Sequence, residues 1–306
     1  MRLPEFSVVI PPRNRPESLT RCLDALAAQE LSLETFEVIV VDDGSDLPIT
    51  LNPSRWDMSF TLRLVRQVNS GLGGARNRGV EEAFGEYLAF TDDDCVPSRS
   101  WLLELKVGLE EYPGSLIGGS TYNCLRNHFF LEVSQLILWL VYEHFNRDIT
   151  NSCFFTSNNI GCRREDFFAV VGFDSSYRIA SEDRDFCSRW RSSNRTLVWR
   201  REAWIEHMHA QNLVGFIKLH FRYGIGAWKY QHSSAVDRPG PIIEESHFHF
   251  ALPKLIARQL RGKSFTRRVA ILAALAVWQV AYVAGYLYAV VGNLIFGGGF
   301  EEKAIP

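Results

Sequence analysis

Residues 86–94 read EYLAFTDDD, an apolar segment that ends in three consecutive aspartates. An earlier segment, FEVIVVDDGS over residues 36–45, has the same form, because its apolar run also ends in acids. Short apolar runs bounded by polar residues are typical of buried strands in a parallel sheet. Since the carboxyl ends of parallel strands meet at one edge of a sheet, where ligands bind, we expect the two groups of acids to converge there.

Strands and helices alternate around these two segments. Apolar runs predict further strands over residues 6–11 and 61–65, and helical spacing of apolar residues predicts helices over residues 15–29, 73–84 and 101–111. This alternation predicts βαβ units and hence an α/β fold with a doubly wound sheet. This alternation of strands and helices ends at about Gly118. Residues 129–145 (FFLEVSQLILWLVYEHF) predict an amphipathic helix, for which a place in the core is favoured over membrane contact.

The composition excludes several classes of protein. The 306 residues include 33 Lys and Arg against 35 Asp and Glu, so the formal charge of −2 gives no reason to expect a nucleic-acid partner. A hydrophobic content of 46% with 22% charged residues excludes a disordered chain. The six cysteines lie far apart without a C-x-x-C pair, which argues against a zinc site or a disulfide scaffold and fits a reducing compartment.

The C-terminal region contains a long apolar run. Residues 269–296 include no Asp, Glu, Lys, Arg or His, and the run exceeds the roughly 20 residues that a membrane-spanning helix needs. Six basic residues and no acid occupy residues 254–268 just before it. Because basic residues beside a span stay on the cytoplasmic side, we expect membrane association with the residues that precede the span on the cytoplasmic side. A buried helix of a soluble domain and a dimer helix remain alternatives, since Gln279 and Asn293 interrupt the run.

The aspartates are the first candidate for chemistry. Asp92, Asp93 and Asp94 are costly to hold together unless a cation compensates their charge. Mg²⁺ and Mn²⁺ bind carboxylate oxygens and commonly bridge to a phosphate. The alternative is a solvated acidic turn that precedes the helix at Trp101. The second acidic group, at Asp42 and Asp43, favours the cation site.

Two further segments carry candidate site residues. NSGLGGARNRG, over residues 69–79, is a glycine-rich turn that exposes backbone N–H groups, and Arg76 adds a donor suited to phosphate. It is not a dinucleotide fingerprint, because Arg76 occupies the place of the third glycine, and the chain contains no P-loop motif. In ASEDRDFCSRW, over residues 180–190, Glu182 and Asp183 suit the first turn of a helix. The functional interpretation is a carboxylate that acts as a general base.

Taken in chain order, five segments resemble the family 2 glycosyltransferases. They are SVVIPPRNRPESL (7–19), VVDDGS (40–45), NSGLGGARNRG (69–79), FTDDDC (90–95) and GFDSSYRIASEDRDFCSRW (172–190). The resemblance covers roughly residues 6–209. It implies the GT-A fold, a Rossmann-like doubly wound mixed sheet, here with a C-terminal helical tail. It also implies transfer of a sugar from a nucleotide diphosphate sugar, with inversion at the anomeric carbon.

The resemblance places residues around the donor and a metal ion. Pro11, Arg13 and Asp43 match positions around the nucleobase and ribose, and a UDP-sugar is the expected donor. Arg76 matches the basic residue near the nucleotide. In the D-x-D motif, Asp92 and Asp94 match the residues that hold Mn²⁺ or Mg²⁺ and the donor, and Asp93 lies near the donor. His207 resembles the histidine that closes the site near the metal in some relatives.

The resemblance also assigns the base and the acceptor contacts. Asp183 matches the catalytic base of the E-D motif, and Glu182 is its neighbour. An inverting displacement needs only this one base, whereas a pair of carboxylates flanking one bond would indicate a hydrolase. The stretch FFTSNNIG (154–161) matches the part that faces the acceptor, so Asn158 and Asn159 are candidate sugar contacts.

These features together predict three parts and one leading function. Residues 1–115 form the nucleotide-sugar half, 116–250 the acceptor and base half, and 251–306 the basic segment and membrane helix. With no Q-x-x-R-W motif after the base and one clear span, we expect addition of one sugar to a lipid-linked or cell-surface polysaccharide precursor. One alternative is a catalytically silent, sugar-nucleotide-binding scaffold subunit of a membrane assembly. A nucleotidyltransferase would need a phosphate loop where the chain has PPRNRP.

Overall fold

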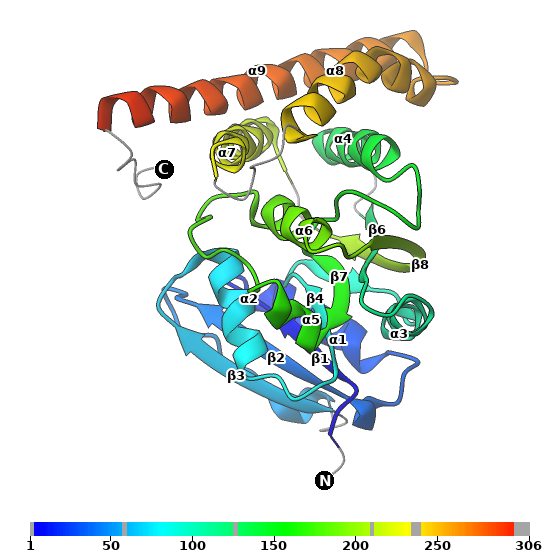
Figure 1. The fold of residues 1–306 in the computed structure, drawn as a ribbon, viewed down its shortest axis with the longest axis vertical. Coiled ribbons are helices and arrows are strands. Elements are labelled where there is room, and N and C mark those ends of the chain that lie inside the picture. The colour runs from blue at the N-terminus through cyan, green and yellow to red at the C-terminus, as the bar shows by residue number, and fades with distance from the viewer. Residues whose placement is uncertain (1–2, 57–59, 125–127, 209–210, 234–239, 297–306) are drawn as a thin grey trace. The chain divides into compact units, whose positions relative to one another are not determined.

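The computed structural model describes residues 3–56, 60–124, 128–208, 211–233 and 240–296 (Figure 1). The chain divides into two compact units, and each is discontinuous in sequence. The first comprises Met1–Cys124, Asp148–Ser176 and Glu182–Met208, and the second Leu125–Arg147, Tyr177–Ser181 and His209–Pro306. The three-part division at residues 115 and 250 is a prediction about function, and it stays a prediction.

The first unit is built on a sheet. Within the described residues, eight strands form this sheet in the order β3-β2-β1-β4-β7-β6-β8-β5. The strands are β1 (Phe6–Ile10), β2 (Phe36–Asp43), β3 (Thr61–Gln67), β4 (Tyr87–Thr91), β5 (Cys95–Pro97), β6 (Leu116–Asn123), β7 (Asn159–Arg163) and β8 (Leu197–His207). Short 3-10 helices occupy Leu33–Thr35 and Pro53–Trp56.

The N-terminal half of the sheet is parallel and covered on both faces, as the apolar runs predict. β1 pairs in parallel with β2 and β4, and β2 with β3. Val8 belongs to one hydrophobic cluster with the buried side chains of α1 (Pro16–Ala27). Val9 points to the opposite face because side chains alternate along a strand, and there it meets α2 (Gly71–Glu81) at Gly79. α3 occupies Trp101–Glu111, the range that its helical spacing predicts.

The C-terminal half of the sheet is mixed, which agrees with the expected fold class. β7 is antiparallel to both β4 and β6, β6 is parallel to β8, and β8 is antiparallel to β5. In the last pair, Cys95 at the start of β5 lies opposite His207 at the end of β8. This pairing brings the end of β8 to the aspartates that follow β4.

Aromatic packing positions the remaining helices of the first unit, α5 (Arg164–Ala169) and α6 (Glu182–Ser192). The rings of Phe173 and Phe186 are stacked with centroids 4.4 Å apart. Phe90 of β4 contacts both Phe167 and Phe173, with ring centroids 5.6 Å apart in each case. These contacts hold the first turn of α6 near the carboxyl end of β4.

The second unit is helical. It comprises α4 (Phe129–Phe145), α7 (Leu213–Gln231), α8 (Gly240–Gln259) and α9 (Phe265–Phe296), which is orange to red in Figure 1. The bounds of α4 are those that its sequence predicts, and three of its buried side chains share a hydrophobic cluster with Phe216, Leu252 and Trp278 from the other three helices. α4 is therefore a core helix of this unit. α9 begins at Phe265, earlier than the apolar run predicts.

Candidate active site

Asp43, the last residue of β2, holds the glycine-rich turn in place. Its carboxylate accepts hydrogen bonds from the backbone nitrogens of Ser70 and Gly71, at 2.7 and 3.0 Å. It also accepts from the side-chain amides of Gln67 and Asn69, both at 2.8 Å. These backbone donors lie at the start of α2, where a carboxylate is favourable. Asp43 thus joins α2 to β2, and its contact with the nucleotide remains a prediction.

Arg76 joins the D-x-D segment to the E-D segment. Its side chain is only 1% exposed. Its two terminal nitrogens bind carboxylates from distant parts of the chain, Nη2 to Asp92 Oδ1 at 2.7 Å and Nη1 to Glu182 Oε1 at 3.1 Å. The guanidinium also lies over the ring of Phe173, 5.5 Å from its centroid. Because a buried charge must be paired, this one residue binds the two acidic motifs together.

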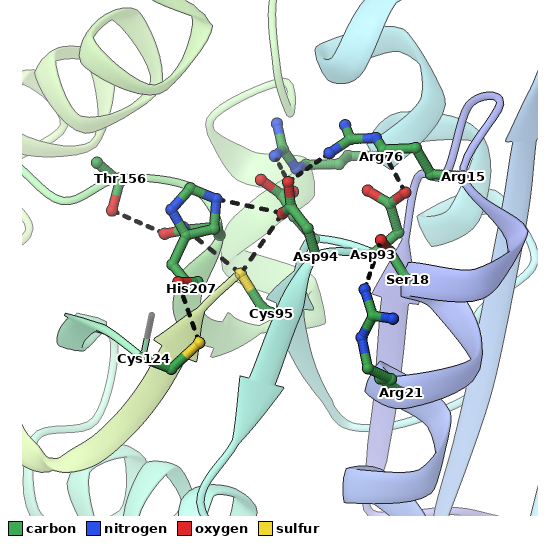
Figure 2. A network of polar contacts seen from close by, with 12 residues as sticks. Arg15, Ser18, Arg21, Arg76, Asp93, Asp94, Cys95, Cys124, Thr156 and His207 are labelled. Carbon is green, nitrogen blue, oxygen red and sulfur yellow. Dashed lines mark hydrogen bonds and ion pairs between the residues drawn. The ribbon is translucent and has the colours of Figure 1, made fainter. Parts of the chain in front are cut away.

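Asp94 is the centre of a second polar network (Figure 2). His207 Nε2 lies 3.3 Å from Asp94 Oδ1. Arg15 approaches from the other side, with an ion pair to Asp94 Oδ2 and its Nε 3.3 Å from Asp93 Oδ2. The β5–β8 pairing explains why a histidine so far along the chain reaches Asp94.

The electrostatics of this network favour a bound cation. Burial, with repulsion from Asp94 and Asp92, raises the pKa of Asp93 to about 7, although Arg15 opposes the shift. Burial lowers the pKa of His207, but the hydrogen bond and charge of Asp94 outweigh it, so that this pKa is raised. Burial is the largest cause of the Asp93 shift, whereas Asp94 causes the shift of His207; the neighbouring carboxylates contribute to both, because they carry more negative charge than their partners neutralise. A divalent cation bound to these carboxylates would reduce this excess of negative charge.

The donor atoms at Asp94 fit such an ion. Within the described residues, one possible ligand group has the ligand atoms of Asp94, Cys95 and His207 within 4.8 Å of one another. Carboxylate oxygen and imidazole nitrogen suit Mn²⁺, and carboxylate oxygen suits Mg²⁺. Burial and the charges of Asp92 and Asp94 raise the pKa of the Cys95 thiol well above its ordinary value, and sulfur is a softer ligand than Mg²⁺ and Mn²⁺ prefer. Asp94 and His207 are the donors that fit, whereas Asp92 is paired with Arg76.

Asp183 lies in the first turn of α6. Burial and the neighbouring charge of Glu182 raise the pKa of Asp183 to about 7, and the backbone N–H of Arg184 donates to its carboxylate at 2.8 Å. A carboxyl group with a pKa near neutrality is suited to accept a proton at physiological pH. The structure thus places the predicted base next to Glu182, which Arg76 binds.

Three of the other predicted site residues differ in their surroundings. Pro11 is buried after β1, whereas Arg13 is exposed and its side chain makes no hydrogen bond or ion pair with the residues that the structure describes. Asn158 is buried beside the Asp94 network. Its amide donates to Cys95 Sγ at 3.7 Å and accepts a hydrogen bond from Thr156 Oγ1 at 2.8 Å.

The amide of Asn159 is used within the sheet. It accepts a hydrogen bond from Trp101 Nε1 at 2.8 Å and donates to the carbonyl oxygens of Ser120 and Ala203, at 3.0 and 2.9 Å. The side chain is buried, so it holds β7 to the neighbouring strands. Its contact with an acceptor sugar is untested and stays a prediction.

Sequence reasoning missed two residues of the Asp94 network, Arg15 and Cys95. Arg15 follows the first strand in the turn PPRNRP, and the carboxyl end of that strand lies beside the carboxyl end of β4. A basic residue at that edge of the sheet was therefore the available signal. Cys95 directly follows the three aspartates, but only its pairing with His207 shows that it faces the site.

Comparison with known proteins agrees with this geometry. The model of the family described as Glycosyl transferase family 2 matches residues 7–169, more than half of the chain. The chain therefore belongs to glycosyl transferase family 2, which confirms the resemblance seen in its motifs.

Two curated relatives are similar over part of their length. Glycosyltransferase AglE of Haloferax volcanii is 33% identical over 123 residues, which cover 39% of this chain and 40% of that protein. The amylovoran biosynthesis glycosyltransferase AmsB of Erwinia amylovora is 32% identical over 195 residues, 60% of this chain and 63% of that protein. The chain thus aligns with 40 to 63% of the length of these two relatives.

Solved structures share the fold. Mannosyltransferase PcManGT from Pyrobaculum calidifontis, in complex with GDP-Man and Mn²⁺, superimposes with a TM-score of 0.63 at 18% identity, over 97% of this chain and 88% of that one. S. aureus TarS 1–349 in complex with UDP-GlcNAc gives a TM-score of 0.51 at 17% identity, over 95% and 85% of the two chains. At these identities the likeness shows the fold alone, a mixed α/β sheet of the GT-A type.

Proposed function

We propose that this protein is a metal-dependent, inverting glycosyltransferase that moves one sugar from a nucleotide diphosphate sugar to an acceptor hydroxyl. The observation that carries the proposal is the position of Arg76. It binds Asp92 of the D-x-D segment and Glu182 of the E-D segment, so the candidate base Asp183 and the donor-side carboxylates belong to one site. The nucleotide sugars bound by PcManGT and TarS support a donor of this class.

A divalent cation would be held by Asp94 and His207. The resemblance of the D-x-D segment adds Asp92, which Arg76 binds, as a further candidate ligand. When bound, it supplies positive charge that offsets the charge developing on the diphosphate leaving group. The Mn²⁺ in the PcManGT complex supports this choice of ion. Arg15 pairs with Asp93 and Asp94 from the side opposite His207. It thereby neutralises part of the negative charge of these carboxylates.

Asp183 would take the proton from the acceptor hydroxyl. Glu182 is less suited to this task, because one of its oxygens is bound by Arg76 in a buried ion pair. The raised pKa of Asp183, about 7, leaves a substantial fraction as carboxylate at neutral pH while keeping it a competent proton acceptor. Asn158 beside Cys95 is a candidate contact for the sugar.

The acceptor would be lipid-linked or a precursor of a cell-surface polysaccharide, reached from the cytoplasmic side of a membrane. Within the described residues, one helix, Phe265–Ile295 of α9, is long and apolar enough to cross a membrane, which is weak evidence of membrane association. The basic residues that precede it favour the cytoplasmic side. The role of AmsB in amylovoran biosynthesis supports a polysaccharide product.

A donor screen tests the proposal. The full chain would be offered UDP-, GDP- and dTDP-sugars with Mn²⁺ or Mg²⁺, and thermal stabilisation and slow donor hydrolysis would be measured with and without EDTA. We expect one donor class to stabilise the protein only when metal is present. Folded protein that responds to no donor would refute the proposal. Binding without hydrolysis or transfer would favour the silent scaffold.

Two variants separate the assigned roles. Asp94→Asn should lose the metal-dependent stabilisation, because it removes a carboxylate ligand. Asp183→Asn should keep that stabilisation and lose transfer. The matched control is Asp174→Asn, which makes the same change of charge at an exposed position in the segment between α5 and α6. Transfer by Asp183→Asn at the rate of this control would refute the assignment of the base.

A further inference from the structure

One whole face of α9 is apolar and exposed. Exposed side chains recur every three or four residues from Val269 to Ile295, which is the spacing of one helix face. The larger ones range from 42% exposed at Tyr288 to 77% at Leu294. At 1.5 Å per residue, this face is about 40 Å long. We name it the apolar stripe, represented by Val269, Leu272, Val280, Val283, Leu287 and Leu294.

The opposite face of α9 is packed directly on the backbone of α7. A Cβ on Gly285 would lie 1.9 Å from the carbonyl oxygen of Phe221, and a Cβ on Gly224 would lie 2.0 Å from that of Tyr282. Only glycine permits such an approach at both positions. Tyr286 adds a hydrogen bond from its hydroxyl to the side chain of Gln231, at 2.8 Å. The two helices therefore form one tightly packed pair.

This packing argues against a helix that crosses the bilayer. α7 contacts α9 around Tyr282, close to the middle of a helix that runs from residue 265 to residue 296. If α9 spanned the membrane, the part of α7 beside it would lie deep in the hydrocarbon. That part carries Arg222 and Lys229, and Arg222 is exposed. Charged side chains at that depth are strongly disfavoured.

The charges near the start of α9 indicate what covers the stripe. Residues 246–300 include six Lys and Arg residues and no Asp or Glu. Glu132 and Glu143 of α4 pair with three of the six. The other three are exposed and have no carboxylate partner in the part of the chain that the structure describes; they are Lys254, Arg261 and Arg268. An anionic lipid surface complements apolar and basic groups together, whereas a second copy docked through the same stripe would bring the same unpaired basic residues.

We propose that α9 lies in the plane of an anionic membrane surface, with the apolar stripe immersed in the acyl boundary and both helix ends on one side of the bilayer. This inference rests on the membrane association in the proposed function and replaces a span by a surface-bound helix. The spatial order is then lipid, α9 and α7, so Arg222 stays out of the hydrocarbon.

Binding to vesicles tests the occupant of the stripe. The full chain would be sedimented with phosphatidylcholine vesicles, with and without phosphatidylglycerol, for the native protein and for Val280→Glu. The matched control is Leu3→Glu, because Leu3 is 72% exposed and Val280 69%. We expect tighter binding to the anionic vesicles and a loss of roughly tenfold or more for Val280→Glu, with Leu3→Glu unchanged. Equal vesicle binding by Val280→Glu and Leu3→Glu would overturn the proposal. It would also be overturned if the native protein bound no vesicles and formed a dimer that Val280→Glu dissociates, because the stripe would then be covered by a second copy.

Labelling from either side of the membrane tests the orientation. Single cysteines would replace Ser264 and Asn293, at the two ends of α9, after replacement of the two incompletely buried cysteines, Cys124 and Cys153, by serine. We expect an impermeant maleimide to label both ends in inverted membrane vesicles and neither in right-side-out vesicles. Labelling of the two ends from opposite sides would demonstrate a span and overturn the proposal. Neither experiment measures sugar transfer, so failure here is distinct from failure of the proposed activity.

Discussion

Replacement of Arg76 by methionine tests how the two acidic motifs are held together. Methionine keeps most of the length and the packing against Phe173 but removes the charge. Asp92 and Glu182 then lose the cation that pairs with them at 2.7 and 3.1 Å. Removing one partner of a buried ion pair costs about 3–5 kcal/mol, because the remaining charge is left uncompensated. Arg76 is almost fully buried, so we expect its loss to fall in this range.

Arg78 provides a matched control on the same helix. It also pairs with two carboxylates, those of Glu81 and Glu82, but its side chain is 41% exposed. Exposed pairs contribute little to stability because water and salt screen them. Arg78→Met should therefore leave the unfolding temperature nearly unchanged. The pair of variants compares the same chemical change in a buried and an exposed setting.

The assay is thermal unfolding followed by tryptophan fluorescence. A loss of 1 kcal/mol lowers the Tm by roughly 2–4 °C in domains of this size, so Arg76→Met should lower it by about 6 °C or more. The double variant Arg76→Met/Glu182→Gln should recover part of the loss, because it removes the more buried of the two stranded carboxylates. Equal Tm values for Arg76→Met and Arg78→Met would refute the reasoning. No recovery in the double variant would show that the cost does not come from the unpaired charge of Glu182.

Further predictions concern the base, the metal and the helix pair. Asp183→Asn should lower the transfer rate by about 10²–10⁴ at unchanged donor affinity, measured by initial rates and donor titration. Because the unprotonated form of Asp183 is the active one and its pKa is about 7, the native rate should rise through that pH and level off above it; a flat profile would contradict the assignment. His207→Ala should raise the Kd for Mn²⁺ by roughly tenfold or more in calorimetry, because one donor is lost, and an unchanged Kd would exclude His207 as a ligand. Gly285→Val should destabilise the α7–α9 contact by about 1–3 kcal/mol or more, whereas Ala284→Val, on the exposed face, should not; thermal unfolding distinguishes the two.

The parallel half of the sheet was predictable because its signals are local. β1, β2 and β4 are continuous apolar runs that end in turns or acids, and such runs indicate buried strands without knowledge of their neighbours. The helical spacing of residues 101–111 and 129–145 likewise indicates α3 and α4 with their observed bounds. The mixed half was not predictable in detail, since the 11 residues of β8 show their place only when paired with β6 and β5.

By itself the sequence determined the fold class, the acids at the strand ends and the segment that carries Asp183, because strand periodicity and motif order are properties of the linear chain. Only the tertiary structure decided which groups meet. It brought Arg15 and His207 to Asp94, directed Arg76 to two carboxylates, and placed the amide of Asn159 within the sheet. Each of these contacts joins residues far apart in the chain. Which residues come into contact depends on strand order and register, and the hydrophobic spacing along one segment does not encode these.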